Sequence, residues 1–456
     1  MKKIFTIIFI LIFSTTVYAN EKRFLEFNKW LLKNEFTDYI KLVFAEGTGK
    51  CKTLEKFSQH WYYNKCDKFK KIVPNYKVDT YNGRSEIPED NVNPNYETLL
   101  YYLWEYLTGN WTNNPKYSDI KSSENPYQFQ FDLREDKYIK KQMQKTALLS
   151  YLLYEDGKIV IDELSPLNKF GKIFTNETKY HSQSVGKSVA SYILGHAICK
   201  GYVESIDSKI DDWPLIENSL YQNQKIIDLI NMKAGDKKYF SPKDSSNRFA
   251  NSKSNHSVTN ITIKSAMENE LKNSKKSGKE WAYNNLLPHL ILNYIIFKAD
   301  EDNFQKLLED VFRDKAGIEY DAFFVESETS NSSDRSITST LLATRYDYLR
   351  IAKAMLDDWQ NDTCEGKYLK SLHERKVKKN TDYRDKQEAY SNAKSYGGFF
   401  HLDPSGMKNR HIFIMDGYGG QTLTIDFDKR RIVTTMAIHR NFNWKKIAHS
   451  VIKKGK

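Results

Sequence analysis

The sequence has few cysteines and no spacing that is typical of a metal site. Its 456 residues contain no C-x-x-C pair, and the ten histidines show no ligand spacing. Both observations argue against a structural zinc site, so we predict that the chain binds no metal. The four cysteines are Cys51, Cys66, Cys199 and Cys364.

Long apolar runs are missing after the first residues. The run from Ile4 to Phe13 follows two lysines and is too short to span a membrane. Together with Ala19 it is typical of a secretory signal peptide (residues 1–19), with cleavage expected after Ala19. Asn20 follows instead of cysteine, which argues against a lipid anchor. No later segment approaches 18 uninterrupted apolar residues, so we expect a soluble periplasmic or secreted protein with no membrane span.

The chain also has no concentrated basic strip. Its formal charge is +12, and it falls to +10 when Lys2 and Lys3 leave with the signal peptide. The excess is dispersed over lysine-rich loops, which favours a solvated surface over a nucleic-acid site.

An exported protein can form disulfides. Cys51 and Cys66 are close in sequence and flank a short aromatic segment, so we predict that they pair. A loop of that length contributes about 3 kcal/mol in the chain-entropy model. Cys199 follows an apolar helical stretch and is expected in the core, and the partner of Cys364 is left open.

Apolar periodicity divides the mature chain into two regions. Residues 20–144 are helical and aromatic, as in Phe24 to Phe44 and Tyr96 to Trp111, and are predicted to form an N-terminal extension. Residues 145–456 form the second domain. It begins with two strands between Thr146 and Leu164, joined by an Asp-Gly turn that is typical of a hairpin.

Helical stretches then occupy the middle of the second domain. They run through His181–Gly201, KIIDLINM, Trp281–Ile296, Phe304–Phe312 and Thr338–Trp359. The polar segment Asp236–Lys279 is predicted to be an exposed insertion. The last block contains the strand-like runs SYGGFFHL, RHIFIMDG, QTLTIDF and RRIVTTMAIHR, and a final helix is expected near Trp444. We therefore predict an α+β fold with one antiparallel sheet formed from both ends of the domain and flanked by helices.

One helix carries a candidate nucleophile. Ser184 and Lys187 are spaced S-x-x-K, which brings a hydroxyl and an amine onto the same face of a helix. Burial would favour the neutral amine, which can take the proton of the hydroxyl and produce a nucleophilic serine.

The S-x-x-K spacing alone is weak evidence, because it also occurs at Ser118, Ser391, Ser405 and Ser450. Those four lie in polar, turn-rich or terminal sequence. Ser184 instead opens a long apolar-periodic run that contains the small residues Gly186 and Ala190. We therefore select Ser184.

The order of these motifs resembles the serine β-lactamase and penicillin-binding-protein superfamily, in particular the class C-like esterase branch that includes 6-aminohexanoate-dimer hydrolases. The resemblance starts near Thr146 and excludes the extension. It depends on the following runs: LLYEDGKIVIDE, SQSVGKSVASYILGHAICKGYVESID, IIDLINMKAGD, WAYNN, ATRYDYLRIAKAM and GYGGQTLTIDF. It implies a β-lactamase/transpeptidase-like fold with Ser184 as nucleophile and Lys187 as its base.

The second motif of that family is Y-x-N. Matches begin at Tyr62, Tyr221, Tyr283 and Tyr390, and we select Tyr283 because it opens an apolar helical run after a polar loop. The resemblance implies that the phenol of Tyr283 relays protons and that Asn285 orients Lys187 and the substrate. A packing role for Tyr283 against Trp281 is the alternative.

The third motif departs from lactam-processing relatives, which carry K-T-G on the strand that lines the site. This chain has D-G-Y-G-G-Q with no Lys or His at that place, similar to the G-x-x-G-Q of the amide- and ester-hydrolysing branch. By that likeness Gly417, Gly419 and Gln421 line the site, and the N–H groups of Tyr418 and Ser184 form the oxyanion hole. A tight turn is the alternative explanation for the glycines.

Two further residues have both a structural and a functional interpretation. His181 is expected to be a loop histidine near the helix start, and it could also line a cleft. Asp416 suits a turn or a substrate amine.

The sequence thus predicts an exported serine hydrolase that cleaves a small amide or ester through an acyl-enzyme, without a cofactor. A D,D-peptidase or β-lactamase is the alternative within enzymes, and a non-catalytic envelope binding protein is the alternative outside them.

Overall fold

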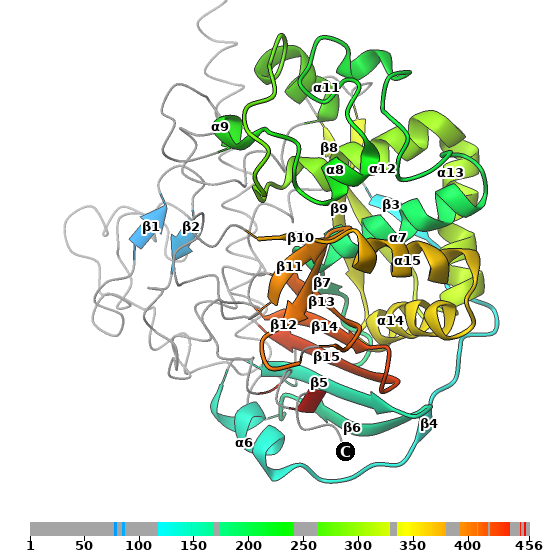
Figure 1. Cartoon of the computed structure of the whole chain (residues 1–456). Coiled ribbons are helices and arrows are strands. Elements are labelled where there is room, and N and C mark those ends of the chain that lie inside the picture. The colour runs from blue at the N-terminus through cyan, green and yellow to red at the C-terminus, as the bar shows by residue number, and fades with distance from the viewer. Residues whose placement is uncertain are drawn as a thin grey trace, which may run out of the picture. The chain divides into compact units, whose positions relative to one another are not determined.

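A computed structural model gives the architecture of the chain (Figure 1). It describes residues 77–79, 84–86, 117–146, 148–167, 171, 174–240, 262–328, 335–379, 393–407, 409–417, 420–437, 447 and 451–452. The chain divides into two compact units, and the larger comprises Lys116–Met143, Leu148–Ala437 and Asn443–Lys456. In the other unit the structure describes the antiparallel strands β1 (Lys77–Asp79) and β2 (Arg84–Glu86).

Within the described residues, the larger unit contains a sheet of nine strands in the order β10-β11-β12-β13-β14-β15-β5-β6-β4. Neighbours are antiparallel except for β4 and β6, which run parallel. The bounds are β4 Gln130–Phe131, β5 Leu148–Glu155, β6 Lys158–Leu164, β10 Val377–Lys378, β11 Ala393–Gly397, β12 Phe400–Pro404, β13 Ile412–Gly417, β14 Gln421–Asp426 and β15 Arg431–Ala437.

This sheet joins the two ends of the second domain, as predicted. The hairpin β5–β6 turns at Asp156 and Gly157, which have φ of 44° and 91°. Strand β15 pairs with β5, with Val433 opposite Leu153, so the C-terminal strands lie beside the hairpin (Figure 1). Every residue of β13, β14 and β15 is buried, as expected for strands covered on both faces. The predicted α+β fold class is confirmed.

Helix α7 (Val185–Cys199) is the central helix of this unit. It is buried from Val185 to Ala197, which follows from an apolar character all round the helix rather than along one stripe. It packs against β13, β9 (Arg335–Ala343), α12 (Leu286–Ala299) and α15 (Cys364–Glu374). The helix predicted within His181–Gly201 is confirmed over Val185–Cys199.

A second sheet corrects one sequence prediction. Its order is β3-β8-β9-β7, with bounds Tyr117–Ile120, Ala322–Glu328, Arg335–Ala343 and Tyr180–His181. The helix predicted from Thr338 to Trp359 is wrong in its first part, because those residues form β9 and only α14 (Arg345–Gln360) is helical. β-Branched residues favour the strand, and the Thr344 hydroxyl then accepts the N–H of Asp347 and caps the helix.

The predicted helix from Trp281 also begins later, at Leu286, because the Asn284 side chain caps it there. The segment Asp236–Lys279 was predicted to be an exposed insertion. This prediction is wrong in part where the structure describes the segment, because Asp236, Ile263 and Met267 are buried. The remaining helical elements are α6 Lys137–Lys145, η3 Pro214–Ile216, α8 Ile226–Ile230, α9 Lys237–Phe240, α11 Ile263–Ser265, η5 Ala266–Glu270, α13 Glu301–Leu308 and η6 Glu309–Ala316.

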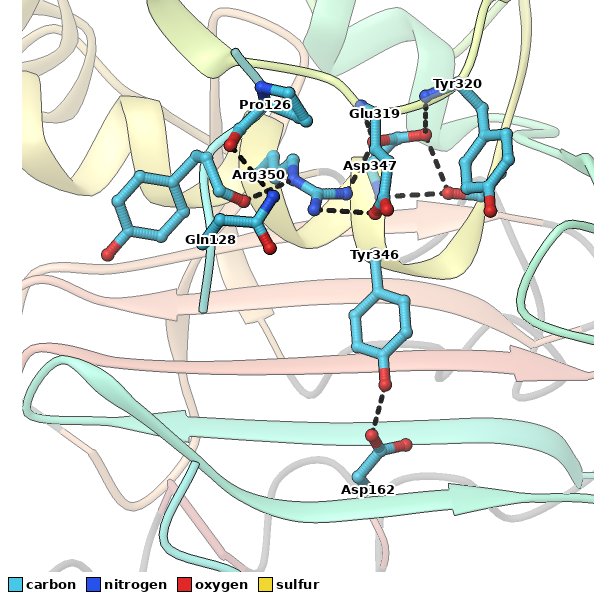
Figure 2. A network of polar contacts seen from close by, with 10 residues as sticks. Pro126, Gln128, Asp162, Glu319, Tyr320, Tyr346, Asp347 and Arg350 are labelled. Carbon is cyan, nitrogen blue, oxygen red and sulfur yellow. Dashed lines mark hydrogen bonds and ion pairs between the residues drawn. The ribbon is translucent and has the colours of Figure 1, made fainter. Parts of the chain in front are cut away.

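A buried polar network ties the start of α14 to its surroundings (Figure 2). Arg350 donates to Asp347 and to Glu319 at 2.8 Å, and its Nε donates to the carbonyl of Tyr127 at 3.0 Å. Below it, the Tyr346 hydroxyl donates to Asp162 on β6. These contacts attach the start of α14 to β6 of the large sheet and to the segments around Tyr127 and Glu319.

The structure settles a cysteine pairing that the sequence leaves open. Cys199, which the sequence places in the core, is half-buried and forms a disulfide with Cys364. The bond joins the last residue of α7 to the first residue of α15. The predicted Cys51–Cys66 pair lies outside the described residues. Trp444, near which a final helix is predicted, also lies outside them, and residues 447 and 451–452 are described as helical.

The described part of the predicted extension contains the strands β1, β2, β3 and β4 and nearly all of α6. Strand β3 pairs with β8, and β4 pairs with β6. The domain boundary at residue 144 and the signal peptide stay predictions. In the part of the chain that the structure describes, no helix has the length and apolar character needed to cross a membrane.

Candidate active site

A tight turn leads from strand β7 into helix α7 and presents Ser184. Gln183 has φ of 50°, a left-handed conformation that is uncommon for a residue with a side chain. Two contacts hold it: its N–H donates to His181 Nδ1 at 3.0 Å, and the Ser182 hydroxyl donates to its carbonyl at 3.1 Å. Leu341 of β9 donates its N–H to the Ser182 hydroxyl at 2.9 Å. The turn is therefore anchored to the second sheet.

The structure brings Ser184 and Lys187 together. Ser184 stands at the N-terminal end of α7, and the Lys187 Nζ lies 2.7 Å from the Ser184 Oγ. Lys187 is only 5% exposed, whereas Ser184 is half-buried. A long cationic side chain is rarely buried without a partner, and here the serine hydroxyl is one of its contacts.

Tyr283 lies beside the same amine. The Lys187 Nζ is 5.1 Å from the centre of the Tyr283 ring. Two buried aromatic residues hold the ring in place, with Trp281 at 6.2 Å and Tyr396 of β11 at 6.3 Å between ring centres. The three residues that sequence reasoning selected thus converge, although they come from two helix starts about 100 positions apart. Their catalytic roles stay predictions.

A buried histidine lies near the same lysine. His289, on α12, is fully buried, and burial lowers its pKa to about 3, with the nearby charge of Lys187 as the second cause. His289 is therefore neutral at physiological pH. Asn285 is half-buried directly before α12, two residues after Tyr283 in the chain.

The end of strand β13 lies against the turn that carries Ser184. A Cβ on Gly417 would lie 2.7 Å from the Ser182 carbonyl oxygen, so only glycine permits this approach. Gly420, with φ of 102°, donates its N–H to the Gly417 carbonyl and closes the connection to β14. Tyr418 and Gly419, which complete the predicted oxyanion and substrate wall, lie outside the described residues.

Other sequence candidates have structural partners. Gln421 is fully buried and donates to the carbonyl of Ala437 at 2.9 Å, which ties β14 to β15. His181 was predicted in a loop but lies at the end of strand β7, where it accepts the N–H of Gln183 and supports the nucleophile turn. Asp416 was predicted in a turn or at a substrate amine but is buried on strand β13. Tyr221, a rejected match to Y-x-N, is fully buried.

Comparison with known proteins finds a match in structure only, since no protein-family model and no curated protein matches this chain. A protein from Bacillus anthracis assigned as a 6-aminohexanoate-dimer hydrolase matches with a TM-score of 0.55 and 16% identity, over 80% of this chain and 96% of its own. This chain has the β-lactamase/transpeptidase-like fold. A protein from Bacteroides dorei assigned as a β-lactamase matches with a TM-score of 0.51 and 14% identity, over 70% and 97%. The resemblance drawn from the motifs is confirmed at the level of the fold.

On this β-lactamase/transpeptidase-like fold, sequence reasoning missed one buried group next to the candidate site. Asp236 is fully buried and accepts hydrogen bonds from Asn284 at 2.7 Å and from the Tyr221 hydroxyl at 3.0 Å. Burial raises its pKa to about 7. Its polar, lysine-rich surroundings in the sequence gave no signal of this burial.

The arrangement can support proton transfer at a serine. A hydroxyl on a rigid helix start lies within hydrogen-bond distance of a buried amine, and a phenol-bearing side chain lies next to that amine. Within the described residues, no group of three or more His, Cys, Asp or Glu side chains is placed to hold a metal ion.

Proposed function

We propose that this protein is an exported serine hydrolase that cleaves an amide or ester carbonyl through an acyl-enzyme on Ser184. The observation that carries the proposal is the 2.7 Å contact between the Lys187 Nζ and the Ser184 Oγ at the start of a buried helix. A serine with an adjacent base is the arrangement that nucleophilic catalysis requires.

In the proposed reaction, Ser184 Oγ attacks the carbonyl carbon while Lys187 accepts the hydroxyl proton, a step that requires the unprotonated form of the amine. The negative oxygen of the tetrahedral intermediate is held by the N–H groups of Ser184 and Tyr418. The intermediate collapses, the bond to the leaving amine or alcohol breaks, and Tyr283 with Lys187 returns the proton to that group. Water then attacks the acyl-enzyme with the same groups as base and acid, and the carboxylic acid leaves.

Two observations support an amide or ester over a β-lactam or peptidoglycan substrate. The sequence has no Lys or His where K-T-G would supply a cation for a substrate carboxylate. The Bacillus anthracis structure, which is assigned as a 6-aminohexanoate-dimer hydrolase, matches over 80% of this chain and 96% of its own.

The test uses a fluorophosphonate probe on the mature protein, with the modified residue located by peptide mass spectrometry. We expect labelling of Ser184 in the wild type, none in Ser184→Ala, and full labelling in Ser405→Ala, which removes an exposed serine with the same S-x-x-K spacing. Wild-type protein that stays unlabelled beside a labelled reference hydrolase would contradict the proposal.

A panel of small esters and amides then defines the substrate class. Nitrocefin and a fluorescent penicillin belong in the same panel. If these compounds are turned over or stably bound and no ester or amide is cleaved, the protein is a β-lactamase or D,D-peptidase instead.

A further inference from the structure

A buried carboxyl group lies directly behind the loop that carries Tyr283. Asp236 follows Gly235, which has a positive φ of 72° in the segment after helix α8. The Asp236 Oδ2 accepts the side-chain N–H of Asn284 at 2.7 Å and the hydroxyl of Tyr221 at 3.0 Å. All three side chains are at most 1% exposed. Both hydrogen bonds are therefore shielded from bulk water.

Asn284 connects this carboxyl group to the helix behind Tyr283. Its Oδ1 accepts the N–H groups of Leu286 and Leu287 at 2.9 and 3.0 Å, so the amide caps α12 on one side and donates to Asp236 on the other. Both ends of the amide are in use, which fixes its orientation.

The other side of Tyr283 is held as well. The N–H of Ala282 donates to the carbonyl of Met232 at 2.8 Å. Met232 and Asp236 belong to the same short segment after α8. Both chain neighbours of Tyr283 are thus attached to this one segment. Ala282 is attached through its backbone N–H, and Asn284 is attached through its side chain, which donates to Asp236.

We propose that Asp236 is a positioning residue for Tyr283, acting through Asn284 to hold the phenol next to Lys187 for proton transfer at Ser184. This inference rests on the proposed function of Ser184. Asp236 itself touches neither Lys187 nor Ser184 in any contact that the structure shows, so its effect passes through the loop.

The protonation state of Asp236 gives this role a recognisable signature. Burial raises its pKa to about 7, while Tyr221, Asn284 and the charge of Lys276 act in the opposite direction. The titratable groups around Asp236 and its partner Tyr221 are Lys276, which acts on Asp236, and Tyr239, which acts on Tyr221. Hydrogen bonds to an ionised carboxylate are about twice as strong as those to a neutral acceptor. The hold on Asn284 therefore strengthens as the pH rises through about 7.

Two substitutions separate these effects. Asp236→Asn keeps an oxygen that can accept from Asn284 and Tyr221 but never ionises. Asp236→Ala removes the acceptor and leaves two buried donors without a partner. The matched control is Asp347→Asn, which alters another fully buried carboxylate that accepts several hydrogen bonds, at the start of α14.

The experiment measures the second-order rate of fluorophosphonate labelling of Ser184 between pH 5.5 and 9, with the folded fraction checked by circular dichroism. We expect Asp236→Ala to label about tenfold more slowly or worse at every pH. Asp236→Asn should match the wild type within threefold at pH 6 and fall roughly five- to tenfold behind it at pH 8.5. Asp347→Asn should keep the wild-type rate per folded molecule.

Several results would overturn the proposal. If the ratio of the wild-type rate to the Asp236→Asn rate stays constant across the pH range, ionisation of Asp236 does not strengthen the positioning of Tyr283. If Asp236→Ala is folded and labels at the wild-type rate, Asp236 has no positioning role. Should Asp236→Ala fail to fold, the pH dependence of the Asp236→Asn ratio decides alone. Failure of the proposed function is distinct, because the wild type itself would then stay unlabelled.

Discussion

Replacing Gly417 by alanine would place a methyl group against the turn that carries Ser184. The added Cβ would lie 2.7 Å from the Ser182 carbonyl oxygen and 3.1 Å from the Gln183 Cβ. Non-bonded carbon atoms prefer separations of about 3.5–4.0 Å, so either β13 or the turn must move by roughly 0.5–1 Å. The oxygen is a backbone atom that also accepts the N–H of Val185, so it cannot move without disturbing the first turn of α7.

A displacement of about 1 Å in a reacting group lowers rates by on the order of 100-fold. We therefore expect Gly417→Ala to slow the labelling of Ser184 by about 10- to 100-fold. The same overpacking should lower the free energy of unfolding by roughly 1–3 kcal/mol. Rates are measured with the fluorophosphonate probe, and stability by urea unfolding under the same conditions.

The control is Gly157→Ala at the β5–β6 turn. Its Cβ would meet nothing within 4 Å, and its φ of 91° makes the substitution strained. It should destabilise the protein without changing the labelling rate per folded molecule. The reasoning fails if Gly417→Ala labels within twofold of the wild type, or if both glycine variants lose labelling equally.

Three further predictions concern stability. Replacing Cys199 and Cys364 by serine opens a loop closed over a sequence separation of 165 residues and should lower the free energy of unfolding by about 5 kcal/mol in the chain-entropy model; an unchanged urea midpoint would contradict this. The pKa of His289 falls from 6.5 to about 3 on folding, so its neutral form favours the folded state above pH 6.5 and stability declines as the pH falls towards 3. Between pH 6.5 and 5 the decline is roughly 2 kcal/mol, and His289→Leu should flatten that part of the profile. Thr344→Ala removes the cap of α14 and should lower the free energy of unfolding by about 1 kcal/mol; an unchanged free energy of unfolding would mean that the Asp347 N–H finds another acceptor.

The parts of the fold that the sequence predicted are those with local causes. The Asp156–Gly157 turn requires positive φ at both residues, which marks the hairpin without any knowledge of the rest of the chain. The apolar run after Ser184 likewise predicts a buried helix. The S-x-x-K spacing places its two side chains on one face, and the 2.7 Å contact follows from helix geometry.

The parts that it missed depend on distant partners. Residues of β9 fit a helical pattern as well as a strand, and pairing with β8 decides between them. The Cys199–Cys364 bond depends on how α15 packs against the end of α7, and no feature of either local sequence shows it. Asp236 is buried because Asn284 and Tyr221 enclose it, a tertiary effect that its polar sequence neighbours conceal.

The most direct test of the central claim is the rate at which the fluorophosphonate probe labels Ser184 in Lys187→Met. Methionine fills the buried space of lysine but cannot accept a proton. If Lys187 is the base, the rate at pH 8 should fall by about 100- to 10,000-fold while the protein stays folded. A folded Lys187→Met protein that labels within threefold of the wild type would contradict the account.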